Sequence, residues 1–141
     1  MNPLLEPDWS ALQEAAKQAA AHAHAPYSSF CVGAAVLWAN GEVTCGVNVE
    51  NASYPLGVCA ERHAVAAGVL AGHAAQGPVR AVAVWADSEK SLRPCGGCRQ
   101  VLQEFCDGQP EQVLLACSHG SQWEQRTLAE LLPEAFGPHS L

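Results

Sequence analysis

The chain has 141 residues, a formal net charge of −7 and an apolar fraction of 49%. This length fits one domain with its own hydrophobic core, so we expect a single domain over residues 1–141. The acidic balance is a poor match for a phosphate backbone or an anionic membrane, which argues against nucleic-acid and membrane partners. No apolar run approaches the ~18–20 residues of a membrane span. The start of the chain is acidic and lacks the features of a secretory signal, so we expect a cytoplasmic protein.

The first predicted elements are a helix and a hairpin. Apolar residues recur at helical spacing after Pro7-Asp8, which can cap the helix, and the pattern ends near residue 24. Two apolar runs, residues 30–38 and 43–49, then flank Asn40-Gly41. Runs joined by Asn-Gly predict a β-hairpin, because both turn residues must tolerate positive φ.

The rest of the chain alternates between strand and helix patterns. A loop at residues 50–58 and a polar loop from Asp87 to Arg93 separate these elements. Helices are expected at 59–71, 95–106 and 127–132, and strands at 79–86, 113–117 and 122–125. Strands interleaved with helices predict the α/β class, with three layers and one mixed sheet of about five strands that carries helices on both faces.

Seven cysteines are present, an odd number in a chain without a recognisable secretory signal. This favours reduced thiols, some of them metal ligands, over a disulfide framework. Four cysteines lie on apolar strands or near the ends of elements, and we interpret them as small core residues: Cys31, Cys45, Cys106 and Cys117.

The other three cysteines have the spacing of a metal site. Cys95 and Cys98 flank two glycines at a predicted helix start, and Cys59 opens another helix. The spacing lets two thiolates converge on one metal, and we expect the intervening glycines to remove steric conflict. Zinc accepts thiolate sulfur in tetrahedral geometry, and an open fourth position for water is typical of a catalytic zinc. His63 could close that position, but it points to another helix face than Cys59.

Charged residues beside these cysteines suggest chemistry at the metal. Glu61 lies two residues after Cys59, close to the metal but badly placed to join it alongside that ligand. A carboxylate there can take a proton from metal-bound water and hand it on. Arg62 and Arg99 could each donate a hydrogen bond to a ligand sulfur and offset the charge of three thiolates. Ligand-x-Glu followed by Pro-Cys-x-x-Cys is the general signature of zinc deaminases.

Over nearly its whole length the sequence resembles a cytidine deaminase of the short, three-cysteine type that acts on free nucleosides. The Asp87 to Arg93 loop is less typical of that family. The resemblance rests on Pro26-Tyr27-Ser28-Ser29-Phe30, Val32-Gly33-Ala34-Ala35, Asn48-Val49-Glu50-Asn51-Ala52-Ser53-Tyr54-Pro55, Cys59-Ala60-Glu61-Arg62, Pro94-Cys95-Gly96-Gly97-Cys98-Arg99-Gln100-Val101, Leu131-Leu132-Pro133 and Phe136-Gly137-Pro138.

The resemblance implies a cytidine-deaminase-like fold and hydrolytic deamination of cytidine and deoxycytidine to uridine and deoxyuridine, in pyrimidine salvage. One zinc ion per subunit would be held by Cys59, Cys95 and Cys98. Hydroxide on that zinc would attack C4 of the base while Glu61 moves protons to N3 and to the leaving amine.

The resemblance also implies substrate-binding residues and an assembly. Asn48 and Glu50 match the positions that bind the ribose 3′-hydroxyl, and Phe30 matches an aromatic that packs on the base. The backbone of Ala60, with that of Cys59, matches the groups that read the pyrimidine edge. The short form is a homotetramer, in which Tyr54 and Phe136 of neighbouring subunits help to close the site.

Three other functions share part of this pattern. A blasticidin-type nucleoside antibiotic deaminase has the same cysteines, but Glu50 and Arg62 favour the nucleoside enzyme. A polynucleotide or transfer-RNA deaminase needs a basic groove, which the acidic composition disfavours. A non-enzymatic zinc-binding module would close all four metal positions with protein ligands, whereas Glu61 beside an open position indicates catalysis.

Overall fold

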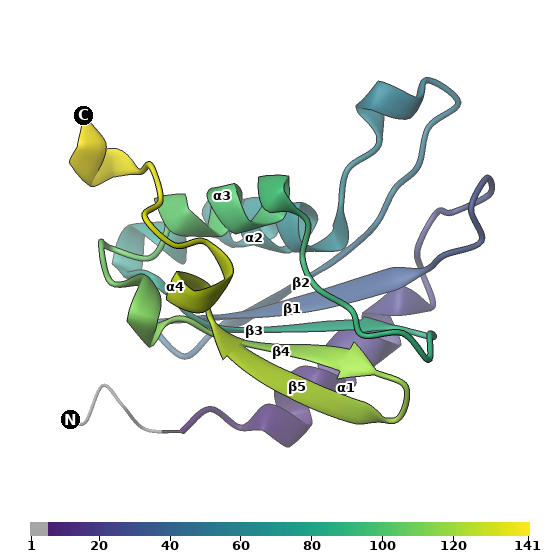
Figure 1. Cartoon of the computed structure of the whole chain (residues 1–141), viewed down its shortest axis with the longest axis horizontal. Helices are drawn as coiled ribbons and strands as arrows, with labels where there is room; N and C mark the ends of the chain where they lie inside the picture. The colour runs from purple at the N-terminus through teal and green to yellow at the C-terminus, as the bar shows by residue number, and fades with distance from the viewer. Residues whose placement is uncertain (1–5) are drawn as a thin grey trace.

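The computed structural model describes residues 6–141, and these contain a five-stranded mixed sheet (Figure 1). The order across the sheet is β2-β1-β3-β4-β5, and β3 and β4 are its only parallel neighbours. The strands are β1 (Val32–Trp38), β2 (Val43–Val47), β3 (Val79–Ala86), β4 (Leu114–His119) and β5 (Gln122–Thr127).

One helix covers one face of the sheet. Helix α1 (Trp9–Ala20) starts where the Asp8 carboxylate accepts a hydrogen bond from the Ala11 N–H. Its buried Leu12 and Ala16 pack on small strand residues, Ala35, Ala81 and Ala83. Small side chains on both surfaces allow the helix to lie close to the strands.

Three helices lie on the opposite face, as Figure 1 shows for α2 (Ala60–Leu70), α3 (Gly96–Glu104) and the short α4 (Leu128–Leu131). The larger hydrophobic core is here, and its largest fully buried side chains include Trp38, Leu102, Leu115 and Leu128. Single turns of 3₁₀ helix lie in the connections: η1 (Tyr54–Leu56), η2 (Ala74–Gln76), η3 (Pro110–Gln112) and η4 (Pro138–Ser140).

The predicted architecture is confirmed: the sheet is mixed, has five strands and carries helices on both faces. The β1–β2 hairpin turns at Asn40-Gly41, although only Gly41 has a positive φ, of 88°. The Asn40 side chain instead supports the turn by accepting a hydrogen bond from the Glu42 N–H, at 3.1 Å. Within residues 6–141 no helix is both long enough and apolar enough to cross a membrane.

The interpretation of four cysteines as core residues is half right. Cys106 and Cys117 are buried, whereas Cys31 and Cys45 are exposed. Cys31 precedes β1, and Cys45 lies on β2, which is an edge strand. Cys45 pairs with Ala35, which is fully buried against α1, but on the edge strand the side chain of Cys45 itself stays exposed. An apolar strand pattern therefore overestimates burial at the rim of a sheet.

Helix α2 lies directly against the backbone of β2. A Cβ atom added to Gly46 would lie 2.3 Å from the Ala64 nitrogen and 2.4 Å from the Ala60 oxygen. Farther along the helix, a Cβ on Gly68 would lie 2.1 Å from the Trp38 ring. These contacts set the height of α2, and hence of its N-terminus, above the sheet.

We expect Gly46→Ala to lower the free energy of unfolding by about 1–3 kcal/mol or more, because neither backbone can yield without moving α2. Chemical denaturation measures the change. Gly57→Ala is the matched control, since a Cβ there would meet no atom closer than 3.4 Å. Equal stability of the two variants would show that α2 is not held against β2 in this way.

Candidate metal centre

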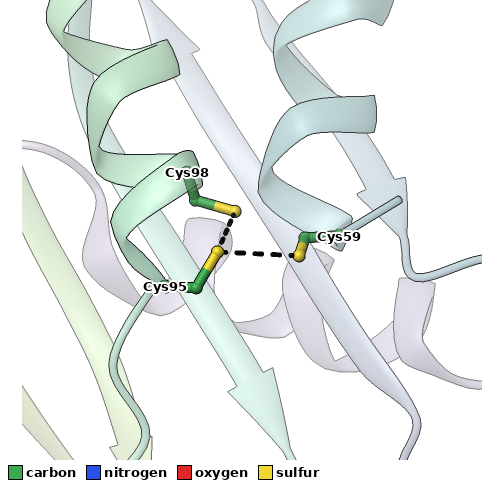
Figure 2. Close-up of side chains that lie close together, drawn as sticks. All are labelled: Cys59, Cys95 and Cys98. Carbon is green, nitrogen blue, oxygen red and sulfur yellow. Dashed lines mark hydrogen bonds between the residues drawn. The ribbon is translucent and has the colours of Figure 1, made fainter. Parts of the chain in front are cut away.

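Three sulfur atoms meet where α2 and α3 begin (Figure 2). The Cys59, Cys95 and Cys98 sulfurs all lie within 4.8 Å of one another. The Cys59–Cys95 distance is 3.8 Å and the Cys95–Cys98 distance is 3.5 Å. Sulfurs in tetrahedral positions ~2.3 Å from a zinc ion would be ~3.8 Å apart. The three cysteines therefore fit a single zinc ion.

The helix starts explain why these sulfurs converge. Cys59 and Cys95 each have extended backbone and immediately precede the first helical residue, so each is an N-cap. Cys98 follows in the first turn of α3. N–H groups in a first helical turn have no partner within the helix, and the helix dipole adds positive potential there. Two helices thus direct positive ends at a cluster that becomes anionic when its thiols ionise.

The glycines between Cys95 and Cys98 do not have the role expected from the sequence. A Cβ on Gly96 would meet no atom within 4 Å, and one on Gly97 would lie 3.8 Å from the Cys95 sulfur. Neither glycine has a positive φ. The expectation that they relieve a steric conflict is therefore wrong within one chain.

The surroundings of the thiols favour a bound cation. Burial raises the pKa of Cys59, and it raises that of Cys98 far above the usual range, so these groups resist ionisation without a positive charge. Burial alone would raise the pKa of Cys95, but the pKa is lowered because hydrogen bonds with the Cys98 N–H and thiol stabilise the ionised sulfur. A divalent cation at the centre would stabilise all three thiolates.

Glu61 lies beside the sulfurs without belonging to their cluster. It is in the first turn of α2, and only 5% of it is exposed. Burial raises the pKa of its carboxyl, while its contact with the Cys98 thiol lowers it less. A raised pKa makes the carboxylate a better proton acceptor, which a general base requires.

His63 is directed away from the sulfurs, in agreement with the sequence interpretation. Its Nδ1 lies 2.8 Å from the Val47 carbonyl, to which the protonated ring nitrogen can donate. This contact joins α2 to the end of β2. The fourth side of the sulfur cluster is thus left without a histidine ligand.

The two arginines do not contact sulfur as hypothesised. Arg99 donates from Nε to the Pro94 carbonyl at 2.8 Å and from Nη1 to the Leu131 carbonyl at 2.7 Å. Arg62 is exposed, and no hydrogen bond of its side chain is found within residues 6–141. The Pro94 and Leu131 carbonyls thus take the Arg99 donors that the hypothesis assigned to a sulfur.

Asn48, predicted to bind the sugar, forms side-chain hydrogen bonds to the backbone of residues 30–32. The Asn48 side chain accepts from the Val32 N–H at 2.8 Å and donates to the Phe30 carbonyl at 2.7 Å. One amide hydrogen and one oxygen lone pair of Asn48 remain for a ligand. Phe30 itself is exposed.

The Glu50 carboxylate joins the same region to the preceding turn. It accepts from the N–H groups of Tyr27 and Ser28, both at 3.1 Å, and from the Ser28 hydroxyl. The Ser28 hydroxyl is the main cause that lowers the pKa of Glu50. The carboxylate is therefore ionised and fixed in direction.

A hollow of about 320 Å³ adjoins these loops and is lined by Tyr27, Ser28, Glu50, Asn51, Tyr54 and Gly57. It brings the predicted Glu50 and Tyr54 together but does not include the three cysteines. Sequence reasoning missed Tyr27, whose ring centroid lies 5.8 Å from that of Tyr54. The Pro-Tyr-Ser-Ser-Phe run was the signal that could have identified it.

The remaining predicted residues lie apart in the chain. Ala60 is fully buried at the start of α2, next to Cys59. Tyr54 is 74% exposed and Phe136 is 62% exposed. In Figure 1 the loop that carries η1 and the segment after α4 extend from opposite ends of the sheet.

Comparisons with known proteins agree with this geometry. Residues 7–115 match the family model described as the cytidine and deoxycytidylate deaminase zinc-binding region. The chain is 42% identical over 125 residues to a cytidine deaminase of Sporosarcina psychrophila, covering 89% of this chain and 88% of the relative. It is 44% identical over 131 residues to a cytidine deaminase of Mycobacterium tuberculosis H37Rv, covering 92% and 90%.

Solved structures show the same arrangement. A crystal structure of cytidine deaminase from Burkholderia pseudomallei matches with a TM-score of 0.79 and 41% identity, over 90% of this chain and 98% of that one. The cytidine deaminase of M. tuberculosis matches with a TM-score of 0.76 and 43% identity, over 94% and 99%. With a zinc-binding sulfur cluster at the starts of α2 and α3 and relatives that match along most of its length, the chain belongs to the cytidine and deoxycytidylate deaminase family.

Proposed function

We propose that the protein deaminates cytidine and deoxycytidine hydrolytically, so that water and the nucleoside give ammonia and uridine or deoxyuridine. The observation that carries this proposal is the cluster of three sulfurs with the buried Glu61 beside it. A zinc ion held by Cys59, Cys95 and Cys98 supplies an activated water for this chemistry. The relatives named above are cytidine deaminases, which supports this choice of substrate.

In this proposal, separate residues of the chain transfer protons to the base and bind its edge. Glu61 takes one proton from the attacking water and gives it to N3, and it then takes the second proton from the new hydroxyl at C4 and gives it to the leaving amine. Burial supports this role, because a raised pKa makes the carboxylate a better acceptor for the proton of the water. The backbone of Ala60 and Cys59, at the open N-terminus of α2, offers polar groups to the pyrimidine edge.

Asn48 and Glu50 bind the ribose in this proposal. The remaining Asn48 N–H can donate to the ribose 3′-hydroxyl. The Glu50 oxygen that accepts from the Ser28 hydroxyl retains a lone pair, which can accept a hydrogen bond from the same 3′-hydroxyl. Their contacts to residues 27–32 fix both groups before substrate arrives. Phe30, on the segment that Asn48 holds, packs on the base.

We further propose that the active form is a homotetramer whose sites include residues of neighbouring subunits. Large apolar side chains are exposed on this chain, among them Leu70, which is 90% exposed, together with Tyr54 and Phe136. Contact with neighbouring subunits would cover such side chains. Tyr54 belongs to η1 and Phe136 follows α4, and in Figure 1 these two segments extend from opposite ends of the sheet, which favours sites that combine them from different subunits.

The direct test of the activity follows the ultraviolet absorbance of cytidine with purified protein. Turnover that is lost on chelation and regained with zinc supports the proposal. Zinc binding without deamination of cytidine would contradict it, and parallel assays with deoxycytidine and blasticidin identify the substrate class.

Glu61→Gln should retain zinc while kcat falls about 10²–10⁴-fold, because only proton transfer is removed. Zinc content and steady-state kinetics are measured together. Cys98→Ala is the contrasting variant, which should lose zinc and stability because metal binding contributes to the free energy of folding. Loss of zinc from Glu61→Gln would make the carboxylate a ligand and refute its assignment as proton shuttle.

Asn48→Ala should impair turnover of cytidine and weaken discrimination against 3′-deoxycytidine. A site built to bind a hydroxyl strongly rejects an analogue that lacks it, so the ratio of kcat/KM for the two nucleosides should be large in wild type and smaller in the variant. Asn40→Ala, in the distant hairpin turn, should keep the wild-type ratio. An unchanged ratio in Asn48→Ala would show that Asn48 does not bind the sugar.

Phe136→Ala should raise KM with zinc retained, because the aromatic group would close a neighbour's site. Mixing it with Glu61→Gln under conditions that allow subunit exchange should restore activity, since some hybrid sites combine an intact Glu61 with an intact Phe136. Kinetics and sedimentation are measured on the same samples. A fully active monomer is incompatible with the proposed assembly.

A further inference from the structure

Glu124, on β5, binds side chains of the loop that precedes Cys95. Its Oε1 accepts from the Ser91 hydroxyl at 2.6 Å. The same oxygen lies 3.4 Å from both Nη1 and Nη2 of Arg93 and 3.1 Å from Nδ1 of His119. One carboxylate oxygen thus joins the loop to both strands of the β4–β5 hairpin.

Backbone contacts confine the same loop. The Leu92 N–H donates to the Ser118 carbonyl at 3.0 Å, and Arg93 Nη1 donates back to the Leu92 carbonyl at 2.7 Å. Pro94 is fully buried, and its carbonyl accepts from Arg99. Every residue from Ser91 to Pro94 is therefore held by a hydrogen bond or by burial just before the first ligand of α3.

The charges in this cluster are partly shielded from water. The side chains of Arg93 and Glu124 are only 25% and 31% exposed. The hydrogen bond from Ser91 lowers the pKa of Glu124 more than burial raises it, and the charge of Arg93 lowers it further. A partly buried network that includes an ionised carboxylate holds a loop better than a single exposed ion pair does.

Among the three cysteines, Cys95 depends most on its preceding loop. Cys98 is buried within the first turn of α3. The approach to Cys59 is fixed by backbone, because Val49 and Val58 exchange two hydrogen bonds of 3.0 Å. Cys95 is exposed and lies outside the helix, so the direction of its sulfur follows the path of residues 91–94.

We propose that Glu124 is a positioning residue for the metal centre, which acts through Ser91 and Arg93 to fix the backbone that directs the Cys95 sulfur at the metal. The proposal rests on the assignment of Cys95 as a zinc ligand under the proposed function. Neither Glu124 nor Arg93 belongs to the residues that the family resemblance singled out.

The test measures metal release and ligand geometry in Glu124→Ala and in the milder Glu124→Gln. Outer groups that orient metal ligands typically change metal affinity 10–100-fold. We expect zinc transfer to a chromogenic chelator to be about tenfold faster in Glu124→Ala and the visible bands of the cobalt-substituted protein to shift. We expect kcat to fall with little change in KM. Glu124→Asp, which keeps the charge, should show zinc release and cobalt bands between those of wild type and those of Glu124→Ala.

Glu130→Ala is the matched control. Glu130 also accepts two hydrogen bonds on one oxygen, from the N–H and hydroxyl of Thr127, but these cap α4 and do not involve the 87–93 loop. It should lower the melting temperature without altering zinc release or the cobalt spectrum. The Glu124→Ala and Arg93→Ala effects on zinc release should not add in the double variant, because they remove the same contact.

Two results would overturn the proposal: zinc release and cobalt bands like those of wild type in both Glu124→Ala and Glu124→Gln, or the same changes in Glu130→Ala. If Glu124→Ala does not fold, Glu124→Gln decides the question. Failure of the proposed function is recognised separately, by wild-type protein that shows no thiolate-to-cobalt charge-transfer band or by Cys95→Ala that keeps its zinc.

Discussion

The meeting of two helix N-termini above the sheet is the constraint on which the candidate site depends. It brings the Cys59 and Cys95 sulfurs to 3.8 Å although 36 positions separate them in the chain. It also directs unpaired N–H groups toward the place where negative charge collects. A displacement of either helix start would open the sulfur cluster, and a displacement of α2 would also move Glu61.

Small residues at the contacts between helices and strands allow the helices to lie close to the sheet. Alanine and glycine recur where helix and strand meet, as at Gly46 under α2 and at Ala35 and Ala83 under α1. Small residues contribute less apolar area per contact than leucine or phenylalanine, but they allow backbones to come near enough to fix relative heights. The position of a catalytic helix is thus set by main chain, which moves less than a flexible side chain.

Sequence reasoning recovered the elements because their local signals agree. Asn40-Gly41 between apolar runs predicts the β1–β2 hairpin, and the run of β3, which is apolar except for Arg80, matches a strand covered on both faces. Residues 59, 61, 95 and 98 could be grouped because their chemistry repeats at motif spacing. The starts of α2 and α3 were predicted one residue too early, because the cysteine at each start is an N-cap and not a helical residue.

What the sequence did not predict depends on neighbours distant along the chain. The partners of Arg99 are carbonyls at 94 and 131, and no local pattern indicates that these acceptors need a donor. Cys45 looks like a core residue until the strand order places it at an edge. The role of the loop before Cys95 could not be seen either, because Glu124 reaches it from β5, which pairs only with β4.

The 36-position separation between Cys59 and Cys95 has a consequence for chain entropy. A metal that joins these residues is a cross-link, and the segment it closes includes α2 and β3, the helix and the central strand beside the site. For a loop of this length, the loop-closure model gives about 4 kcal/mol of stabilisation through the unfolded state. Cys98 adds almost nothing to that amount, because it lies only three positions beyond Cys95. Two of the three sulfurs would therefore restrict the unfolded chain, whereas the third completes the coordination of the metal.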